Sequence, residues 1–125
     1  MNTPRHIGVG EFGPIYEGIK GKEAIEFLIL QRGGEVKDAI YHPKIGDIDI
    51  IWGKGGEKGY GLAKIVEKHP EAIENLSESI ENGEIIDIIP DRIILVNKEN
   101  NQKSIIDLQF NYRVKTWVVT SYIPL

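Results

Sequence analysis

Apolar and polar positions change their spacing along the chain: stretches of helical period occur only before residue 83, and an alternating period dominates after it. Residues 22–32 and 62–69 carry apolar side chains three and four positions apart, which predicts an amphipathic helix in each range. A further helix follows Pro70, with Ile73, Leu76 and Ile80 as its expected buried positions. The front of the chain is therefore predicted to be mainly helical.

Alternating patterns with short polar links predict consecutive strands in the rest of the chain. The expected strands cover residues 36–41, 46–52, 84–89, 92–97, 103–110 and 114–123. On the last strand, Thr116, Val118, Thr120 and Tyr122 are expected to share one face. Helices followed by consecutive strands indicate an α+β fold with an antiparallel sheet.

Residues 1–21 show neither period. They hold five glycines and two prolines, a composition that favours irregular structure. A chain of 125 residues is typical of one domain. We therefore predict an irregular N-terminal arm over residues 1–21 and a single domain over residues 22–125.

Composition and charge exclude several classes of protein. The chain has no cysteine, so disulfides and thiol chemistry are excluded, and a reducing cytoplasm is compatible with it. No apolar run approaches the roughly 20 residues of a membrane span. The net charge of −4 argues against a non-specific nucleic-acid coat protein. It remains compatible with a nuclease that has a local basic patch, or with a protein that binds a basic partner.

His69 is the histidine with the strongest indication of a chemical role. It ends an amphipathic helix on the apolar face, within about a turn of Lys64 and Lys68, and such a histidine can exchange protons near neutral pH. The alternative is a partly buried histidine without a catalytic role. His6 and His42 are expected at the surface, and no zinc-binding spacing is present.

Two carboxylates, Asp47 and Asp49, are separated by one residue on an expected strand. A third ligand at a recognisable spacing is missing, so we interpret them as solvated strand residues. A metal-dependent hydrolase is therefore the weakest hypothesis, and we predict neither a metal nor another cofactor.

A protein that cleaves RNA does not need to supply a nucleophile, because the 2′-hydroxyl of RNA is itself a nucleophile. The site must supply a proton shuttle and donors for the phosphate oxygens. The candidate residues are His69, Lys64, Lys68, Arg92, Thr120 and Tyr122.

Four stretches together carry a resemblance to a known superfamily. They are Gly-Asp-Ile-Asp-Ile-Ile-Trp-Gly at 46–53, Gly-Leu-Ala-Lys-Ile-Val-Glu-Lys-His-Pro at 61–70, Asp-Arg-Ile-Ile-Leu at 91–95 and Lys-Thr-Trp-Val-Val-Thr-Ser-Tyr at 115–122. In order and spacing they resemble the phage-borne branch of the barnase–EndoU–colicin–RelE superfamily. The resemblance extends from about Lys22 to the C-terminus.

The resemblance implies a fold, an activity and site residues. The implied fold has N-terminal helices packed on a four-stranded antiparallel sheet, with a preceding short β-hairpin. The implied activity is metal-independent RNA cleavage that leaves 2′,3′-cyclic phosphate ends. The catalytic positions map onto His69 and Thr120, with Tyr122 two residues on and Ser121 as a minor alternative, while no glutamate matches the barnase-type general base. Arg92 and Lys68 would hold the phosphate, and Lys64 and Ser121 would also contribute to substrate binding.

The resemblance also implies partners and a setting. RNA is the expected partner, with tRNA as one candidate target and an immunity protein as a second partner. The expected protein is a bacterial or phage-encoded toxin in the cytoplasm or delivered into a target cell, without a membrane partner. The alternative is a non-catalytic phage structural or protein-binding module, including an inhibitor of a basic toxin. The oligomeric state stays open.

Overall fold

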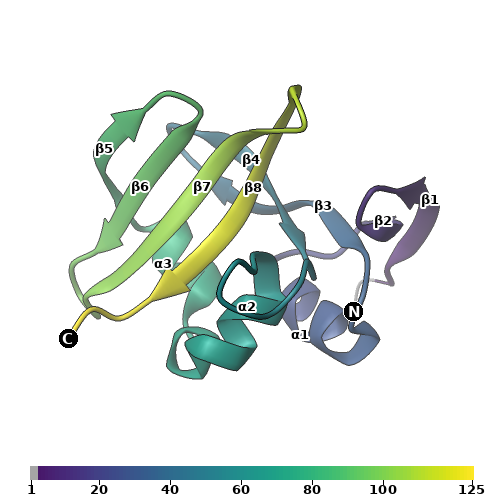
Figure 1. Cartoon of the computed structure of the whole chain (residues 1–125), viewed down its shortest axis with the longest axis horizontal. Coiled ribbons are helices and arrows are strands. Elements are labelled where there is room, and N and C mark those ends of the chain that lie inside the picture. The colour runs from purple at the N-terminus through teal and green to yellow at the C-terminus, as the bar shows by residue number, and fades with distance from the viewer. Residues whose placement is uncertain (1–2) are drawn as a thin grey trace.

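The computed structural model describes residues 3–125 and shows one bent β-sheet with helices against it (Figure 1). The strands are β1 (Arg5–Gly10), β2 (Gly13–Glu17), β3 (Glu35–His42), β4 (Gly46–Ile51), β5 (Glu84–Ile89), β6 (Arg92–Asn97), β7 (Gln102–Phe110) and β8 (Arg113–Tyr122). The helices are α1 (Gly21–Gln31), α2 (Gly61–Lys68) and α3 (Leu76–Glu81), with the 3-10 helix η1 (Pro70–Ala72) between α2 and α3.

The eight strands form a single mixed sheet in the order β1-β2-β3-β4-β8-β7-β6-β5. Neighbouring strands are antiparallel except where β2 pairs with β3 and β4 pairs with β8. The β4–β8 junction has one registered pair, Asp49 opposite Trp117, so two four-stranded halves meet along a narrow join. The prediction of helices on a four-stranded antiparallel sheet is therefore wrong. The antiparallel strands β5–β8 are one half of a larger sheet, and parallel pairing between distant segments leaves no local pattern.

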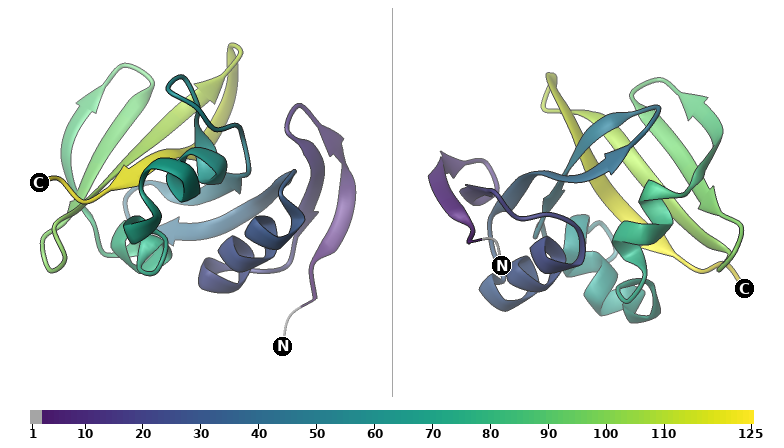
Figure 2. Two further views of the ribbon diagram at one scale, coloured as in Figure 1. Left: turned by 60° about the horizontal axis from the view of Figure 1, so that its bottom comes forward. Right: turned by 180° about the vertical axis from the view of Figure 1, so that it is seen from behind.

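The helices lie together against one side of the sheet (Figure 2). In α1, the predicted apolar stripe is confirmed, because Ala24, Ile25 and Leu28 are buried. Full burial of one such leucine or isoleucine contributes about 1.5–3 kcal/mol. The longest helix is α1, with 11 residues, and no helix in residues 3–125 is long and apolar enough to cross a membrane.

The glycine-rich segment expected to be irregular instead forms the hairpin β1–β2. Its turn carries Phe12, whose ring centroid lies 4.7 Å from that of Phe110 and 6.1 Å from that of Trp117. These aromatic contacts join residues about a hundred positions apart, so a local pattern cannot reveal them. Residues 1 and 2 of the predicted arm lie outside the described residues, and the boundary after residue 21 stays a prediction.

Strand β8 contains a bulge that changes which side chains share a face. The registered partners of Val118 and Thr120 are adjacent residues of β7, which leaves Val119 as an extra residue. Val118 and Thr120 therefore point to opposite sides of the sheet, and the prediction that they share a face is wrong. Thr120 and Tyr122 follow the bulge and lie on the same face.

Candidate functional site

His69 joins α2 to η1, and hydrogen bonds on both sides fix its backbone. Its N–H donates to the carbonyl oxygen of Ile65 at 2.7 Å, and its own carbonyl oxygen accepts from the N–H of Ala72 at 2.9 Å. Pro70 occupies the first turn of η1, a position that needs no N–H donor. The His69 side chain is half-buried. The backbone at His69 is therefore fixed, while part of the side chain stays accessible.

Tyr122, near the end of β8, lies beside this imidazole. The ring centroids of His69 and Tyr122 are 5.3 Å apart, with the ring planes tilted by 36°. On the neighbouring strand β7, Lys103 is the registered partner of Tyr122, and its Nζ lies 6.0 Å from the centroid of the tyrosine ring. The structure thus brings together a proton-transfer group, a phenol and a cation. Lys103 is not among the residues predicted from the sequence, because strand register alone places it here.

A cleft of about 530 Å³ opens beside His69 and Tyr122. Glu71, the second residue of η1, contributes an exposed carboxylate to it. Ile123, Pro124 and Leu125 supply the apolar part of the lining. The sequence alone indicated no glutamate as a general base. The sequence feature that could have indicated this glutamate is the position of Glu71, two residues after the helix-end histidine.

Thr120 lies two residues before Tyr122 on the same face of β8. Its side chain is 6% exposed, and its Oγ1 is the buried side-chain polar atom in residues 3–125 that has no hydrogen-bond partner. Burying a hydroxyl without a partner costs about 1–3 kcal/mol. Because this cost is uncompensated, packing alone does not explain why a hydroxyl-bearing residue occupies position 120.

Ser121 lies on the opposite face of β8 from Thr120 and is fully buried. Its Oγ accepts a hydrogen bond from Nε2 of Gln102 at 2.9 Å and lies 2.8 Å from Oγ of Ser104. The same hydroxyl donates to the carbonyl oxygen of Lys103 at 3.1 Å. The structure therefore places this predicted substrate-binding residue in an internal network, away from the cleft surface.

The two lysines selected on α2 differ in their surroundings. Lys64 is half-buried, whereas Lys68 is exposed and directly precedes His69. Nζ of Lys68 lies 3.8 Å from Oε1 of Glu67, an exposed ion pair that contributes little free energy. Lys68 is therefore free to reorient toward an anion near His69.

Arg92 lies elsewhere on the sheet. Its Nε donates to Oδ1 of Asp107 at 2.7 Å, and this hydrogen bond, opposed by partial burial, raises the pKa of Arg92. Asp107, the partner of Arg92 in the sheet, is four residues along β7 from Lys103, the partner of Tyr122. At the rise of a β-strand this separation is about 13 Å. The structure does not bring Arg92 together with His69.

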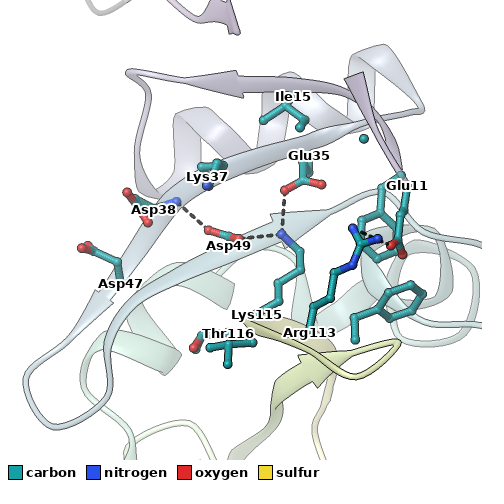
Figure 3. Close-up of a pocket in the computed structure, with 14 residues that line it drawn as sticks. Glu11, Ile15, Glu35, Lys37, Asp38, Asp47, Asp49, Arg113, Lys115 and Thr116 are labelled. Carbon is teal, nitrogen blue, oxygen red and sulfur yellow. Dashed lines mark hydrogen bonds and ion pairs between the residues drawn. The ribbon is translucent and has the colours of Figure 1, made fainter. Parts of the chain in front are cut away.

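The predicted solvation of Asp49 is wrong, while Asp47 is exposed as expected. Asp49 is 7% exposed, and its Oδ2 lies 2.6 Å from Nζ of Lys115. The same Nζ lies 2.6 Å from Oε1 of buried Glu35, so one ammonium on β8 bridges carboxylates on β3 and β4 (Figure 3). Burial lowers the pKa of Lys115, but its hydrogen bonds to Asp49 and Glu35 outweigh this and raise it overall.

This ion cluster lines a charged cleft of about 430 Å³ (Figure 3). At its rim, Arg113 pairs with Glu11 at 3.4 Å. In residues 3–125, no group of three or more His, Cys, Asp or Glu side chains is arranged to hold a metal ion. We therefore interpret the Lys115 cluster as a clamp between the two halves of the sheet.

The other two histidines also differ from each other. His6 is exposed on β1, as predicted. His42 is 4% exposed, with Nε2 2.8 Å from the carbonyl oxygen of Gly83 and Nδ1 accepting from the N–H of Lys44. The predicted surface position of His42 is therefore wrong, because a partner 41 residues away compensates its burial.

His69, Glu71 and Tyr122 line one cleft, and the ammonium of Lys103 lies near the Tyr122 ring. A histidine, a carboxylate, a hydroxyl and a cation are groups that an acid–base phosphodiesterase requires. The family model described as phage-Barnase-EndoU-ColicinE5/D-RelE like nuclease1 matches residues 39–124, which is more than half of the chain. The protein belongs to this family, and the resemblance noted from its sequence is confirmed. Membership supports a nuclease function in general, with nucleic acid as the class of substrate. No curated protein and no solved structure matches the chain.

Proposed function

We propose that this protein is a metal-independent endoribonuclease whose site is the cleft at His69 and Tyr122. The observation that carries the proposal is the contact between these two rings, 5.3 Å apart, in a member of a nuclease family. The site residues come from the end of α2 and from β7 and β8. All of these elements lie within the residues that the family model matches.

The proposed reaction is a transesterification with two proton transfers. Glu71 accepts the proton of the 2′-hydroxyl, and the 2′-oxygen then forms a bond to the neighbouring phosphorus. The bond from phosphorus to the 5′-oxygen breaks, and His69 gives its proton to that oxygen. The products are a 2′,3′-cyclic phosphate and a 5′-hydroxyl. RNA is the substrate, because DNA lacks the 2′-hydroxyl nucleophile.

Negative charge builds up on the phosphate oxygens during this reaction. We assign its stabilisation to the ammonium groups of Lys103 and Lys68 and to the hydroxyls of Tyr122 and Thr120. The Thr120 hydroxyl has no partner within the protein but is buried, so a phosphate oxygen can become its partner only when the side chains that cover it move aside. Arg92 is not assigned to the same phosphate, because about 13 Å of sheet separates it from Tyr122.

The test is incubation of total RNA with the wild-type protein and with His69→Ala. We expect the wild type to cleave RNA in the presence of EDTA, and His69→Ala to be roughly 10²–10⁴-fold slower. The matched control is His6→Ala, which removes an exposed histidine from β1 and should cleave like wild type. Mapping the ends shows whether tRNA is the target and whether the ends carry cyclic phosphates.

Three outcomes contradict the proposal. The first is intact RNA under varied salt, which favours a non-catalytic binding module. The second is cleavage by His69→Ala at the wild-type rate. The third is cleavage that requires a divalent cation.

A further inference from the structure

A third cleft, of about 440 Å³, lies beside α2. Its lining includes Arg32 from the end of α1, Trp52 and Lys54 from the segment after β4, and Val66 and Glu67 from α2. The backbone of Lys54 is fixed by two hydrogen bonds with Tyr60, at 3.1 and 2.9 Å. A defined surface thus presents two cations and an indole.

Trp52 in this cleft, and Tyr60 outside its lining, each have a cation close to the ring. The guanidinium carbon of Arg32 lies 5.2 Å from the centroid of the Trp52 ring, and Nζ of Lys54 lies 5.8 Å from that of Tyr60. Trp52 is half-buried and packs against the hydrophobic core, so its ring is supported from within. A ring supported from within, beside exposed cations, is the arrangement on which single-stranded nucleic acids stack their bases.

Glu67 is the acidic residue of the lining, and its carboxylate has partners within the protein. Oε2 of Glu67 accepts a hydrogen bond from the N–H of Gly56 at 2.9 Å, and its Oε1 lies 3.8 Å from Nζ of Lys68. The hydrogen bond from Gly56 occupies one carboxylate oxygen, while the pair with Lys68 is exposed and weak. Arg32 and Lys54 have no ion pair among the described residues. Both cations are available to a phosphate.

The charge near α2 contrasts with that of the whole chain. The protein carries a net charge of −4, yet Arg32, Lys54, Lys64 and Lys68 all lie on α2 or next to it. Val66 and Glu67, which line this cleft, lie three and two residues before His69, about 3–5 Å along the helix axis. At a rise of about 3.4 Å per nucleotide, a strand bound in this cleft reaches His69 within about one or two nucleotides. A local basic track of this kind attracts phosphates despite the acidic total.

We propose that the cleft at Arg32, Trp52 and Lys54 is a subsite for single-stranded RNA, separate from the cleft at His69. One base stacks on the Trp52 and Arg32 pair, and Lys54 binds an adjacent phosphate. The strand then follows α2 toward His69, where the proposed cleavage takes place. The subsite rests on the proposed function for its choice of RNA. Duplex RNA does not fit it, because paired bases do not expose their faces for stacking.

The first test measures binding with cleavage disabled. Fluorescence anisotropy of a short labelled single-stranded RNA is recorded with His69→Ala as the parent protein. Adding Arg32→Gln and Lys54→Gln should weaken RNA binding. It should also make the plot of log affinity against log salt concentration less steep, by roughly 0.7 for each phosphate that the protein no longer neutralises. The matched control adds Lys22→Gln and Lys98→Gln, which remove two exposed lysines outside the cleft and should bind like the parent.

The second test observes the subsite directly. The chain has two tryptophans, and Trp117 is 3% exposed, so Trp117→Phe in the His69→Ala parent leaves Trp52 as the fluorescent indole. Single-stranded RNA should change Trp52 fluorescence with the same midpoint as the anisotropy. Trp52→Ala should weaken binding roughly 5- to 150-fold, the range of one stacked base. Duplex RNA should produce neither effect.

The outcomes separate the two proposals. Unchanged affinity in the Arg32→Gln/Lys54→Gln protein, or saturation without a change in Trp52 fluorescence, overturns the subsite even if the wild type cleaves RNA. Loss of binding in that protein, together with intact RNA in the cleavage assay, keeps the subsite and contradicts the endoribonuclease. Equal affinity for duplex and single-stranded RNA also overturns the subsite, because base stacking would then play no part.

Discussion

Nε2 of Gln102 lies 2.9 Å from the carbonyl oxygen of Ala72, a hydrogen bond that joins β7 to η1. The same Nε2 donates to Oγ of Ser121 on β8, and Oε1 accepts from Oγ of Ser79 on α3. Ala72 in turn donates its N–H to the carbonyl oxygen of His69. One buried amide therefore connects the segment that carries His69 and Glu71 to the strand that carries Tyr122.

Replacing this amide should loosen the cleft as well as destabilise the fold. Gln102→Leu leaves the partners of the amide without hydrogen bonds, so we expect a loss of roughly 2–4 kcal/mol in the free energy of unfolding. Urea denaturation measures that loss, with exposed Gln31→Leu as the control. If Gln102 also positions His69, kcat for RNA should fall while KM changes little. An unchanged kcat in the folded variant would leave Gln102 with a structural role alone.

Thr120 allows a test in which stability and activity should move in opposite directions. Thr120→Val replaces an unpartnered buried hydroxyl with a methyl group, so the free energy of unfolding should rise by about 1 kcal/mol. RNA cleavage should fall, because the hydroxyl would no longer reach the phosphate. The control Ser121→Ala removes a hydroxyl that is hydrogen-bonded, and it should lower stability instead. A Thr120→Val protein with full activity would argue against a role for this hydroxyl.

Much of the secondary structure could be predicted from the sequence, because period and turn residues are local. The strands expected at 84–89 and 92–97 agree with β5 and β6, and the helix expected at 62–69 agrees with α2. The pairing of β4 with β8 depends on segments more than 60 residues apart, so no window of the sequence reveals it. The bulge at Val119 was missed for a similar reason, since it exists only in relation to β7.

The same distinction applies to the candidate site. The proximity of His69 and Tyr122 follows from a helix end packed against the last strand, and the sequence predicted both residues in one site. Lys103 joins them through strand register, which depends on the turn between β7 and β8 and on the bulges in that pair of strands. Asp49 was interpreted as solvated because its partner, Lys115, lies 66 residues further along the chain. Residues whose roles depend on distant partners are those that local reasoning misses.

Gly61 permits the close approach of α2 to the segment after β4. It has φ +77°, and an added Cβ would lie 2.8 Å from the carbonyl oxygen of Trp52 and 2.9 Å from Cγ1 of Ile51. Gly61→Ala should therefore cost more than the roughly 1–3 kcal/mol of a left-handed backbone alone. Gly56→Ala is the matched control, because Gly56 has φ +91° but no atom within 4 Å of the added Cβ. Equal losses in urea denaturation would show that crowding at Gly61 is unimportant.

The Lys115 cluster should make the stability of the protein depend on alkaline pH. The folded state raises the pKa of Lys115 above its ordinary value of 10.5. A raised pKa means that the folded state binds this proton more tightly than the unfolded state does. The stabilisation is therefore complete below 10.5 and is lost as the pH rises through the pKa of the folded state. Urea denaturation across this window should show that loss in the wild type.

Replacing Lys115 tests whether its ammonium is the source of this effect. Lys115→Met leaves Glu35 and Asp49 buried without their cation, and removing one partner from a buried ion pair costs about 3–5 kcal/mol. The control is Arg5→Met, which breaks an exposed pair with Glu17 of similar length, 2.7 Å, and should cost less than about 1 kcal/mol. The difference in unfolding free energy between wild type and Lys115→Met should narrow above pH 10.5. Tyrosines and the other lysines titrate in both proteins, so their effects cancel in this difference. A difference that stays constant through that pH range would show that titration of Lys115 does not control alkaline stability.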